Sequence, residues 1–391
     1  MERLTSIIIL SYNTCRLLKE CIESIRRYTR PNTYEIIVVD NASSDDSVEW
    51  LSRQNDVRLI ANETNNGFPG GCNQGLRVAH GTELLLLNSD TLVTVYWLDN
   101  MLRALYSDKK VGAVGCMTNT CSNLQKVDVT YGDADEMQSF AEKYNRSNRF
   151  LWIPWYKLVG FCLLFKREVL ERVGYLDEVF SPGNYEDDDY SLRIHLAGYE
   201  LLLCKDTFIH HYGNASFVQG RHVQDMVRKS VEYNDFLSRN ENLFVQKWGL
   251  DSASWNKIDI FTTKIVELAD DHARLLVMDV RCTMDLYFLS DKRPDLQLMG
   301  ISTNKTATNA MGISFSMAYG EDLSIALECV DDDFDGVAIM EPLKNAVLEG
   351  SIFRACLQKI SNRRGKMFFT DGKKVYALDF EDLLELLYKE G

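Results

Sequence analysis

The sequence predicts an α/β protein in which a larger N-terminal unit with a mostly parallel sheet precedes a smaller α/β unit. Strand-like runs alternate with helical runs through the first hundred residues, which is typical of βαβ units. The same alternation restarts near residue 265. At 391 residues the chain is long enough for two or three domains, and 46% hydrophobic residues is ordinary for a globular protein. We therefore expect one domain over 1–255 and a second over 265–391.

The first elements are the most regular. Residues 6–10 are an apolar run of strand length, and the apolar side chains of 15–28 recur at helical spacing. The other elements expected in this part are strands at 34–39, 57–61 and 83–87 and helices at 46–51 and 70–80. Because the helices connect successive strands, we expect a parallel sheet with helices on both faces.

After residue 90 the pattern is less regular. Residues 118–150 are polar, and we expect a loop or insertion over the sheet. The other elements expected in the first unit are helices at 91–105, 166–173, 185–197 and 221–248 and strands at 159–165, 201–203 and 207–209. In the second unit we expect strands at 273–280, 296–301 and 336–340.

Composition argues against several classes of protein. The chain carries 43 Lys and Arg against 57 Asp and Glu, a net charge of −14, which is unfavourable for binding nucleic-acid phosphates or anionic lipid. Its ten cysteines are scattered without a Cys-x-x-Cys pair, which favours buried thiols in a reducing compartment. No run approaches the roughly 18 apolar residues of a membrane span, and the first residues do not resemble a signal peptide. We expect a cytoplasmic protein without a transmembrane segment.

Small polar residues follow each of the first four predicted strands. They are the stretches 11–14, 40–43, 65–73 and 88–90. Parallel α/β sheets bind ligands at the carboxyl ends of their strands, so these residues predict a pocket. Asp40 could accept a hydrogen bond from a nucleobase or ribose, or it could be the N-cap of the following helix. Asp90 stands where a divalent cation on a pyrophosphate would need a carboxylate.

Glycines at 67, 70, 71 and 75 would let the backbone come close to a ligand. No Gly-Lys-Ser/Thr follows them, so they are not a Walker motif, and they lack the spacing of a dinucleotide-binding fingerprint.

Four runs together carry a family resemblance. SIIILSYN, EIIVVDNASSDDSVEWL, NNGFPGGCNQGL and LLLLNSDT resemble the nucleotide-sugar half of family-2 glycosyltransferases, which have the GT-A fold. The resemblance covers roughly residues 4–220 and points to the branch that includes bacterial rhamnosyltransferase-like enzymes. It implies a donor site made of Ser11, Asn13, Asp40, Asn41, Gly67, Phe68, Gly70, Asn73, Asn88, Ser89, Asp90 and Gly160.

The resemblance also implies a metal site. Asn88, Ser89 and Asp90 stand at the family's Asp-x-Asp position, with Asp90 as the ligand of Mn²⁺ or Mg²⁺. Asn88 departs from the family pattern, which costs the site one charge. A histidine in a His-x-x-Gly context is expected to complete the site, and His210 fits that position better than His211.

Four consecutive carboxylates occupy residues 186–189 at the predicted start of a helix. They could simply complement the helix dipole, with Asp189 pairing with Arg193 at i+4. Their mutual repulsion would also raise a carboxyl pKa toward the range of a general base. The run resembles the family's Glu-Asp motif, which implies Asp187 as the catalytic base. Glu186 and Asp189 would then be supporting residues or alternative bases.

Two further regions have open interpretations. Trp152, Trp155 and Tyr156 could form an acceptor platform or belong to the core. Residues 273–285 weakly resemble a class I methyltransferase-like Rossmann sheet, but 279–283 lack the expected glycines and Ser302 replaces the expected acidic residue. The second unit is thus predicted to be a degenerate Rossmann-like domain with a structural or partner-binding role.

The sequence as a whole predicts an inverting, metal-dependent glycosyltransferase, either hexosyl- or deoxyhexosyltransferase. Its donor would be a UDP-, dTDP- or GDP-sugar, and its acceptor a hydroxyl of a glycan, lipid-linked or protein molecule in bacterial cell-surface polysaccharide synthesis. The alternative is a non-catalytic nucleotide-sugar-binding or scaffold module. A nucleotidyltransferase is disfavoured because residues 11–15 contain no glycine-rich loop with Arg and Lys. Peripheral membrane association and a homo-oligomer stay open.

Overall fold

The computed structural model describes residues 3–121, 123–213, 223–250, 260–278, 280, 284–330, 333–342, 355–356, 358–360, 365–370, 375–379 and 382. The chain divides into two compact units, Met1–Leu243 and Phe244–Gly391. The division falls inside helix α8 (Val223–Trp248), where no turn residue marks a boundary in the sequence. No helix among the described residues is long and apolar enough to cross a membrane.

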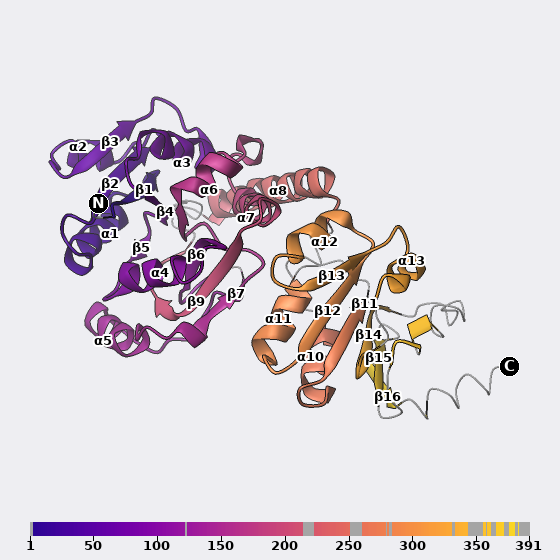
Figure 1. Cartoon of the computed structure of the whole chain (residues 1–391). Helices are drawn as coiled ribbons and strands as arrows, with labels where there is room; N and C mark the ends of the chain where they lie inside the picture. The colour runs from indigo at the N-terminus through magenta and orange to yellow at the C-terminus, as the bar shows by residue number, and fades with distance from the viewer. Residues whose placement is uncertain are drawn as a thin grey trace. The chain divides into compact units, whose positions relative to one another are not determined.

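The N-terminal unit is built on an eight-stranded sheet in the order β3-β2-β1-β4-β8-β6-β9-β7 (Figure 1). Its strands are β1 (Thr5–Ser11), β2 (Tyr34–Asp40), β3 (Val57–Ala61), β4 (Glu83–Asn88), β6 (Val111–Met117), β7 (Trp152–Pro154), β8 (Cys162–Lys166) and β9 (Glu200–Phe208). The first four are parallel, β8 runs antiparallel to β4 and β6, and β7 runs antiparallel to β9. The mostly parallel α/β sheet predicted from the sequence is confirmed.

Helices cover both faces of this sheet. They are α1 (Cys15–Tyr28), α2 (Ser47–Leu51), α3 (Gly67–Val78), α4 (Trp97–Leu105), α5 (Ala134–Tyr144), α6 (Arg167–Val173) and α7 (Glu186–Leu196), followed by α8. Apolar residues of α1 and α4 pack on the odd-numbered side chains of β1, including Ile7 and Ile9. Ile8 points the other way, toward α3. Both faces of the strands are thus buried, which explains their continuous apolar runs.

Helix α3 lies unusually close to β1 because two of its residues have no side chain. A Cβ atom on Gly75 would lie 2.4 Å from Cγ2 of Ile8, and one on Gly71 would lie 2.2 Å from Cδ1 of Leu10. These two glycines therefore serve helix–strand packing, and the expectation that they let the backbone approach a ligand is wrong.

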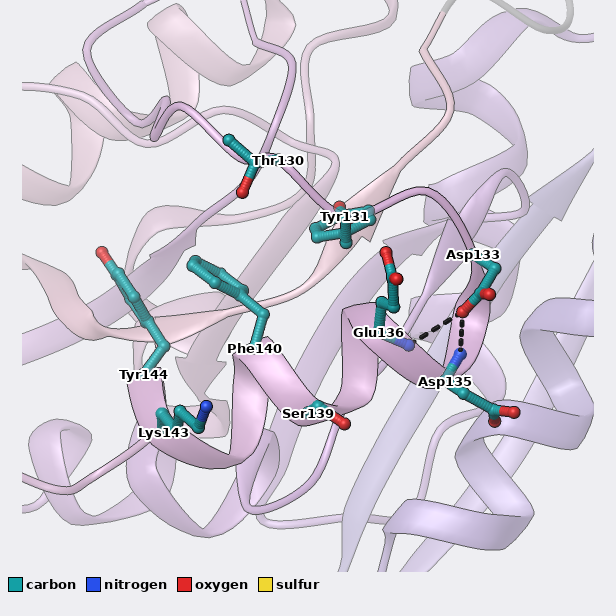
Figure 2. A pocket seen from close by; sticks show the side chains of 9 residues that line it. All are labelled: Thr130, Tyr131, Asp133, Asp135, Glu136, Ser139, Phe140, Lys143 and Tyr144. Carbon is teal, nitrogen blue, oxygen red and sulfur yellow. Dashed lines mark hydrogen bonds between the residues drawn. The ribbon is translucent and has the colours of Figure 1, made fainter.

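Residues 118–150 contain a helix that the sequence did not reveal. Helix α5 buries only Met137 and Ala141, so its apolar periodicity is weak. The Asp133 carboxylate caps its first turn by accepting hydrogen bonds from the backbone N–H groups of Asp135 and Glu136 (Figure 2). Other boundaries also differ. Residues 201–203 and 207–208 belong to the single strand β9, which ends before Ile209, and α4 begins only at Trp97. Helix α3 begins three residues earlier than predicted, and β8 begins three residues later.

The residues before α4 form a small second sheet. Strand β5 (Thr91–Leu92) pairs antiparallel with β10 (His210–His211), so that His210 faces Leu92 and His211 faces Thr91. This pairing brings the end of β9 back to the residues that follow β4.

The second unit contains a six-stranded sheet in the order β13-β12-β11-β14-β15-β16. Its elements are β11 (Arg274–Met278), β12 (Gln297–Ser302), β13 (Ser316–Tyr319), β14 (Gly336–Pro342), β15 (Lys366–Thr370), β16 (Val375–Asp379), α10 (Ile260–Leu268), α11 (Met284–Lys292), α12 (Lys305–Met311) and α13 (Leu323–Glu328). All described pairs are parallel except β15–β16. Ser302 is buried and its hydroxyl accepts from the N–H of Asn304. Residues 279 and 281–283 lie outside the described residues.

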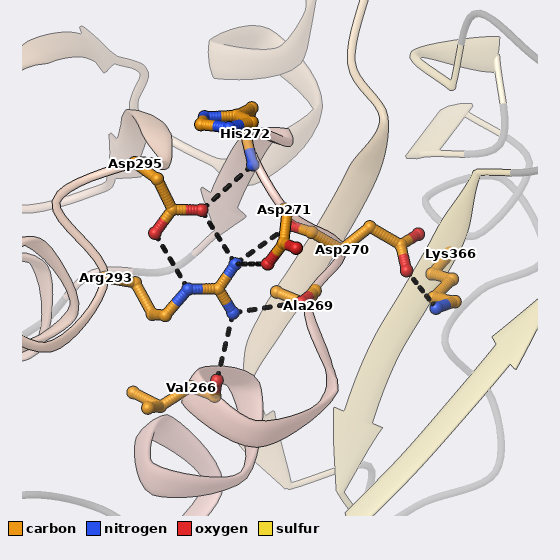
Figure 3. A network of polar contacts seen from close by, with 8 residues as sticks. All are labelled: Val266, Ala269, Asp270, Asp271, His272, Arg293, Asp295 and Lys366. Atoms are coloured by element: carbon orange, nitrogen blue, oxygen red, sulfur yellow. Dashed lines mark hydrogen bonds and ion pairs between the residues drawn. The ribbon is translucent and has the colours of Figure 1, made fainter.

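Arg293 joins the loop before β11 to the end of α11 (Figure 3). Its guanidinium donates to the carbonyls of Val266, Ala269 and Asp270 and to the Asp295 carboxylate. Asp295 also accepts from the N–H of His272, and together these contacts hold its pKa well below the usual range. The network fixes the corner between α10 and β11.

We expect Gly75→Ala to lower the free energy of unfolding by about 1–3 kcal/mol, because the new methyl group overlaps the buried Ile8 side chain. Urea denaturation of the full chain measures the change. The matched control is Gly132→Ala, whose added Cβ would lie 3.6 Å from Oε2 of Glu136 and should change stability by less than about 0.5 kcal/mol. Equal effects of the two substitutions would contradict close α3–β1 packing.

Candidate functional site

Hydrogen bonds join the ends of β1, β2 and β4. The Thr14 hydroxyl lies 3.3 Å from the Ser11 hydroxyl and 3.0 Å from that of Ser89. The N–H of Asn13 donates to Oγ of Ser43 at 2.8 Å. Three of the predicted donor residues, from two strand ends, are therefore brought together.

Asp40 closes the turn that follows β2. Its carboxylate accepts from the N–H of Ser43 at 2.8 Å and from the Ser43 hydroxyl at 2.7 Å. Helix α2 begins later and is preceded by Asp46, so the interpretation of Asp40 as a helix N-cap is wrong. Each carboxylate oxygen can accept a second hydrogen bond, which leaves capacity for a ligand.

Asn41 and Asn73 have structural roles instead of the predicted donor contacts. The Asn41 amide donates to Oδ1 of Asn65 and to the carbonyl of Gly67, and it accepts from Asn62. The Asn73 amide donates to the carbonyl of Leu176 and to Glu178, and it accepts from the N–H of Leu176. These hydrogen bonds hold the loops around the predicted donor site, and both side chains are buried.

The start of α3 packs on the loop before α7. The N–H of Phe68 donates to the carbonyl of Pro182 at 2.7 Å, and a Cβ on Gly67 would lie 2.9 Å from Oγ of Ser181. Gly67 also has a φ of +73°, which favours glycine. Gly70, one turn on, faces Asn66 and Glu178.

Phe68, Gly160 and Asp187 converge from three separate parts of the chain. A Cβ on Gly160 would lie 3.6 Å from the Phe68 ring and 3.6 Å from Cβ of Asp187. The N–H of Gly160 donates to Oδ2 of Asp187 at 2.9 Å. The three predicted residues thus form one wall of a common site.

Asp90 lies beside His211. Nε2 of His211 is 3.2 Å from Oδ1 of Asp90 and 3.4 Å from Nδ2 of Asn88. By contrast, Nδ1 of His210 lies 2.6 Å from the hydroxyl oxygen of Tyr131. Successive side chains of a strand point to opposite faces, so only one of the two histidines can face Asp90. We therefore replace the predicted His210 with His211 as the partner of Asp90.

The chemistry of these side chains fits a divalent cation on a diphosphate. Among the described residues no three His, Cys, Asp or Glu side chains gather as a metal site. Mg²⁺ commonly takes only one or two protein carboxylates and fills its shell with phosphate oxygens and water, and Mn²⁺ accepts carboxylate and imidazole. Asp90 and His211 would hold the cation, with Asn88 next to them.

Residues 160 and 161 connect Asp187 to the Asp90–His211 pair. While Gly160 donates to Asp187, the carbonyl of Phe161 accepts from the N–H of Asn88 at 2.9 Å. The Phe161 ring stacks on His211, with ring centroids 5.2 Å apart and planes inclined by 14°. The two predicted chemical centres are therefore next to each other.

The four carboxylates at the start of α7 have different environments. Asp188 forms a buried ion pair with Lys157 at 2.5 Å, and Asp189 pairs with Arg193 at 2.8 Å, as the i+4 spacing predicted. Glu186 is buried, and burial, with the charge of Asp187, raises its pKa well above the usual value. Asp187 is only partly buried, which leaves it as the carboxylate that a substrate can reach.

The pKa of the Asp187 carboxyl is raised to about 6, first by burial and then by the charge of Asp188, while Lys157 lowers it. A carboxylate with such a pKa is well matched to general-base catalysis near neutral pH.

One stripe of α7 holds the segment 155–160. Asp187 accepts a hydrogen bond from Gly160, and Asp188 binds Lys157. The Ser191 hydroxyl accepts a hydrogen bond from the N–H of Leu158 at 3.1 Å. Nε2 of His195 lies 3.2 Å from the carbonyl oxygens of residues 155 and 156. These helix positions share one face, since they are spaced by about one turn. The stripe aligns the backbone of the segment with the helix.

Trp155 and Tyr156 are almost fully buried, so they belong to the core and do not form an acceptor platform. The indole N–H of Trp152 donates to Asp206 at 2.7 Å.

Sequence reasoning missed Lys157, Ser191 and His195. The spacing of Ser191 and His195 along α7 is visible in the sequence. Nothing in the sequence links these two residues to the segment 155–160.

The sequence profile of glycosyl transferase family 2 matches residues 6–174, from β1 to the residue after α6. Residues 6–174 are therefore similar to the family-2 glycosyl transferase domain. The matched range includes Asp40, Asp90 and Gly160, whereas α7 and the second unit lie beyond it.

Proteins similar to this chain include bacterial glycosyltransferases. The chain is 28% identical over 226 residues to the glycosyltransferase GlyG of Streptococcus pneumoniae, covering 53% of this chain and 69% of GlyG. It is 26% identical over 207 residues to the poly-β-1,6-N-acetyl-D-glucosamine synthase of Staphylococcus epidermidis, covering 50% of this chain and 47% of that protein. The chain therefore spans less than half of the synthase.

Among solved structures, the chain is similar to the mannosyltransferase PcManGT of Pyrobaculum calidifontis in complex with GDP-Man and Mn²⁺. The alignment covers 63% of this chain and 65% of that one, with 21% sequence identity and a TM-score of 0.45.

We expect Lys157→Met to lower the free energy of unfolding by about 3–5 kcal/mol, because it leaves the buried Asp188 carboxylate without its cation. Urea denaturation measures the loss. The double variant Lys157→Met/Asp188→Leu should recover most of it, since both charges of the buried pair are then removed. A single variant as stable as the wild type would show that the pair is not buried in solution.

We expect the contribution of Asp187 to stability to fall as the pH rises from about 4 to about 6. The folded-state pKa of Asp187 is about 6 and lies above its ordinary value of 3.8, so the unfolded chain loses its proton first and ionisation costs the folded state. Asp187→Asn should remove about 1–2 kcal/mol of this fall and be more stable than the wild type at pH 7. Urea midpoints at several pH values test this, and a pH-independent difference between the two proteins would refute it.

Proposed function

We propose that the chain is an inverting glycosyltransferase that moves a sugar from a nucleoside-diphosphate sugar to an acceptor hydroxyl. The observation that carries this is the bridge through residues 160 and 161, which sets a reachable carboxylate with a raised pKa beside the Asp90–His211 pair. The family-2 domain and the names of its relatives support transfer to a bacterial polysaccharide or glycoconjugate.

In this mechanism Asp187 accepts the proton of the acceptor hydroxyl as its oxygen attacks the anomeric carbon. The bond between that carbon and the diphosphate breaks in the same step, and a single displacement inverts the configuration. The Gly160 N–H holds the Asp187 carboxylate in place. A divalent cation held by Asp90 and His211 would supply Lewis-acid neutralisation of the departing diphosphate.

A second candidate is a non-catalytic nucleotide-sugar-binding module of a glycan-synthesis complex. It is favoured by Asn88, which replaces a carboxylate beside Asp90 and lowers the negative charge available for a cation. Binding and turnover must therefore be tested separately.

Nucleotide binding is tested by thermal unfolding with UDP, dTDP and GDP, each with Mn²⁺ or with a chelator. A ligand at about 100 times its Kd stabilises a protein by about 2.7 kcal/mol, so one nucleotide should give a clear metal-dependent shift. Asp90→Ala and His211→Ala should lose this shift, whereas His210→Ala should keep it. A shift that is unchanged by the chelator would contradict metal-assisted binding.

Asp187→Asn should abolish sugar transfer while leaving the nucleotide-dependent thermal shift nearly unchanged, because the amide cannot take a proton at neutral pH. Transfer is measured as release of the nucleoside diphosphate from the donor identified by the thermal shifts. The control is Asp189→Glu, which keeps a carboxylate for Arg193. Retained transfer in Asp187→Asn would remove Asp187 from the role of base.

A further inference from the structure

A hollow of about 650 Å³ opens on helix α5 and the residues that precede it. Its walls include the rings of Tyr131, Phe140 and Tyr144, with Ser139 and Lys143 on the helix (Figure 2). Figure 2 shows Phe140 and Tyr144 rising from the same side of α5 toward Thr130 and Tyr131. The volume is in the range of small-molecule sites, which combine aromatic walls with a few polar groups.

The three rings continue a row of aromatic side chains that starts at the candidate site. The ring centroids of Tyr212 and His210 are 4.7 Å apart, and those of His210 and Tyr131 are 5.7 Å apart. From there the row passes to Phe140 at 6.0 Å and to Tyr144 at a further 5.3 Å. At the inner end, the N–H of Tyr212 donates to the backbone carbonyl of Asp90 at 2.9 Å. The aromatic row therefore links the Asp90–His211 pair to the hollow.

The charge of the side chains that line the hollow indicates which chemical class of ligand it can bind. Carboxylates of Asp133, Asp135 and Glu136 line it, against the single cation of Lys143. This balance is unfavourable for a nucleotide, a phosphate or an anionic lipid headgroup. An uncharged sugar ring has an apolar face that can pack on an aromatic ring and hydroxyls that can bond to the polar rim.

The rings also have a packing role, which alone does not explain the hollow. Phe208, Met137 and Ala141 form a small buried cluster, and the three rings pack against it while remaining partly exposed. Packing requires only their inner surfaces, so the exposed surfaces and the polar rim are available to a ligand.

We propose that this hollow is a subsite for the acceptor glycan, which binds sugar residues that precede the one attacked. The proposal rests on the proposed function, since it assigns the acceptor of that site to an extended, uncharged oligosaccharide. The packed rings of His210 and Tyr212 connect this hollow to the backbone of Asp90.

The test compares binding of the full-length wild-type chain and three variants to an array of immobilised bacterial oligosaccharides of defined sequence. Ser139→Trp fills the hollow without removing a packed side chain, and Phe140→Ala/Tyr144→Ala removes two of its walls. The matched control is Glu142→Trp, which places the same bulk on an exposed position of α5 outside the hollow. Thermal shifts with the nucleotides and Mn²⁺ are recorded for all four proteins.

We expect the wild type and Glu142→Trp to bind the same uncharged oligosaccharides, and the other two variants to bind them at least about tenfold more weakly. The nucleotide-dependent shift should be equal in all four proteins. If no oligosaccharide binds the wild type more tightly than Ser139→Trp, the subsite does not exist. A wild type that binds oligosaccharides through the hollow but binds no nucleotide would support the subsite and contradict the proposed function.

Discussion

The hydrogen bond from the Gly160 N–H to the Asp187 carboxylate is the contact on which the candidate site depends. It joins the segment before β8 to the first turn of α7, and the next residue, Phe161, joins the same segment to Asn88 and His211. Gly160 is buried, and the Phe68 ring and Cβ of Asp187 each lie 3.6 Å from where its Cβ would be. A single backbone stretch thereby sets the distance between the carboxylate and the Asp90–His211 pair.

The rest of α7 protects this contact. Lys157 neutralises Asp188, and Arg193 neutralises Asp189 while its guanidinium also donates to the carbonyls of Val173 and Tyr175. Two of the four adjacent acids are therefore compensated by buried or partly buried cations. The other two acids have raised pKa values: Glu186, which is buried, and Asp187, which faces the site. The helix separates structural carboxylates from the reactive one by giving each a different partner.

The sequence predicted the parallel part of the sheet well because both faces of its strands are buried, and the apolar runs are therefore continuous. The strand-end residues Asp40, Ser89 and Asp90 were also identifiable, since the carboxyl ends of such strands meet. The segment 155–160 could not be assigned, because its contacts with α7 join residues some 30 positions apart. The loop-holding hydrogen bonds of Asn41 and Asn73 could not be assigned for a related reason, because they join residues far apart in the sequence.

In the two-residue strand β10, the side of the strand that a residue faces decides which histidine lies beside Asp90. His210 and His211 are neighbours in the chain, yet one packs on Tyr131 and the other contacts Asp90. Loss or gain of one residue between β9 and β10 would exchange these two environments without changing either histidine. Homologous histidines in this region should therefore be matched by the face of the strand they occupy, because a shift of one position in an alignment assigns the wrong ring to the site.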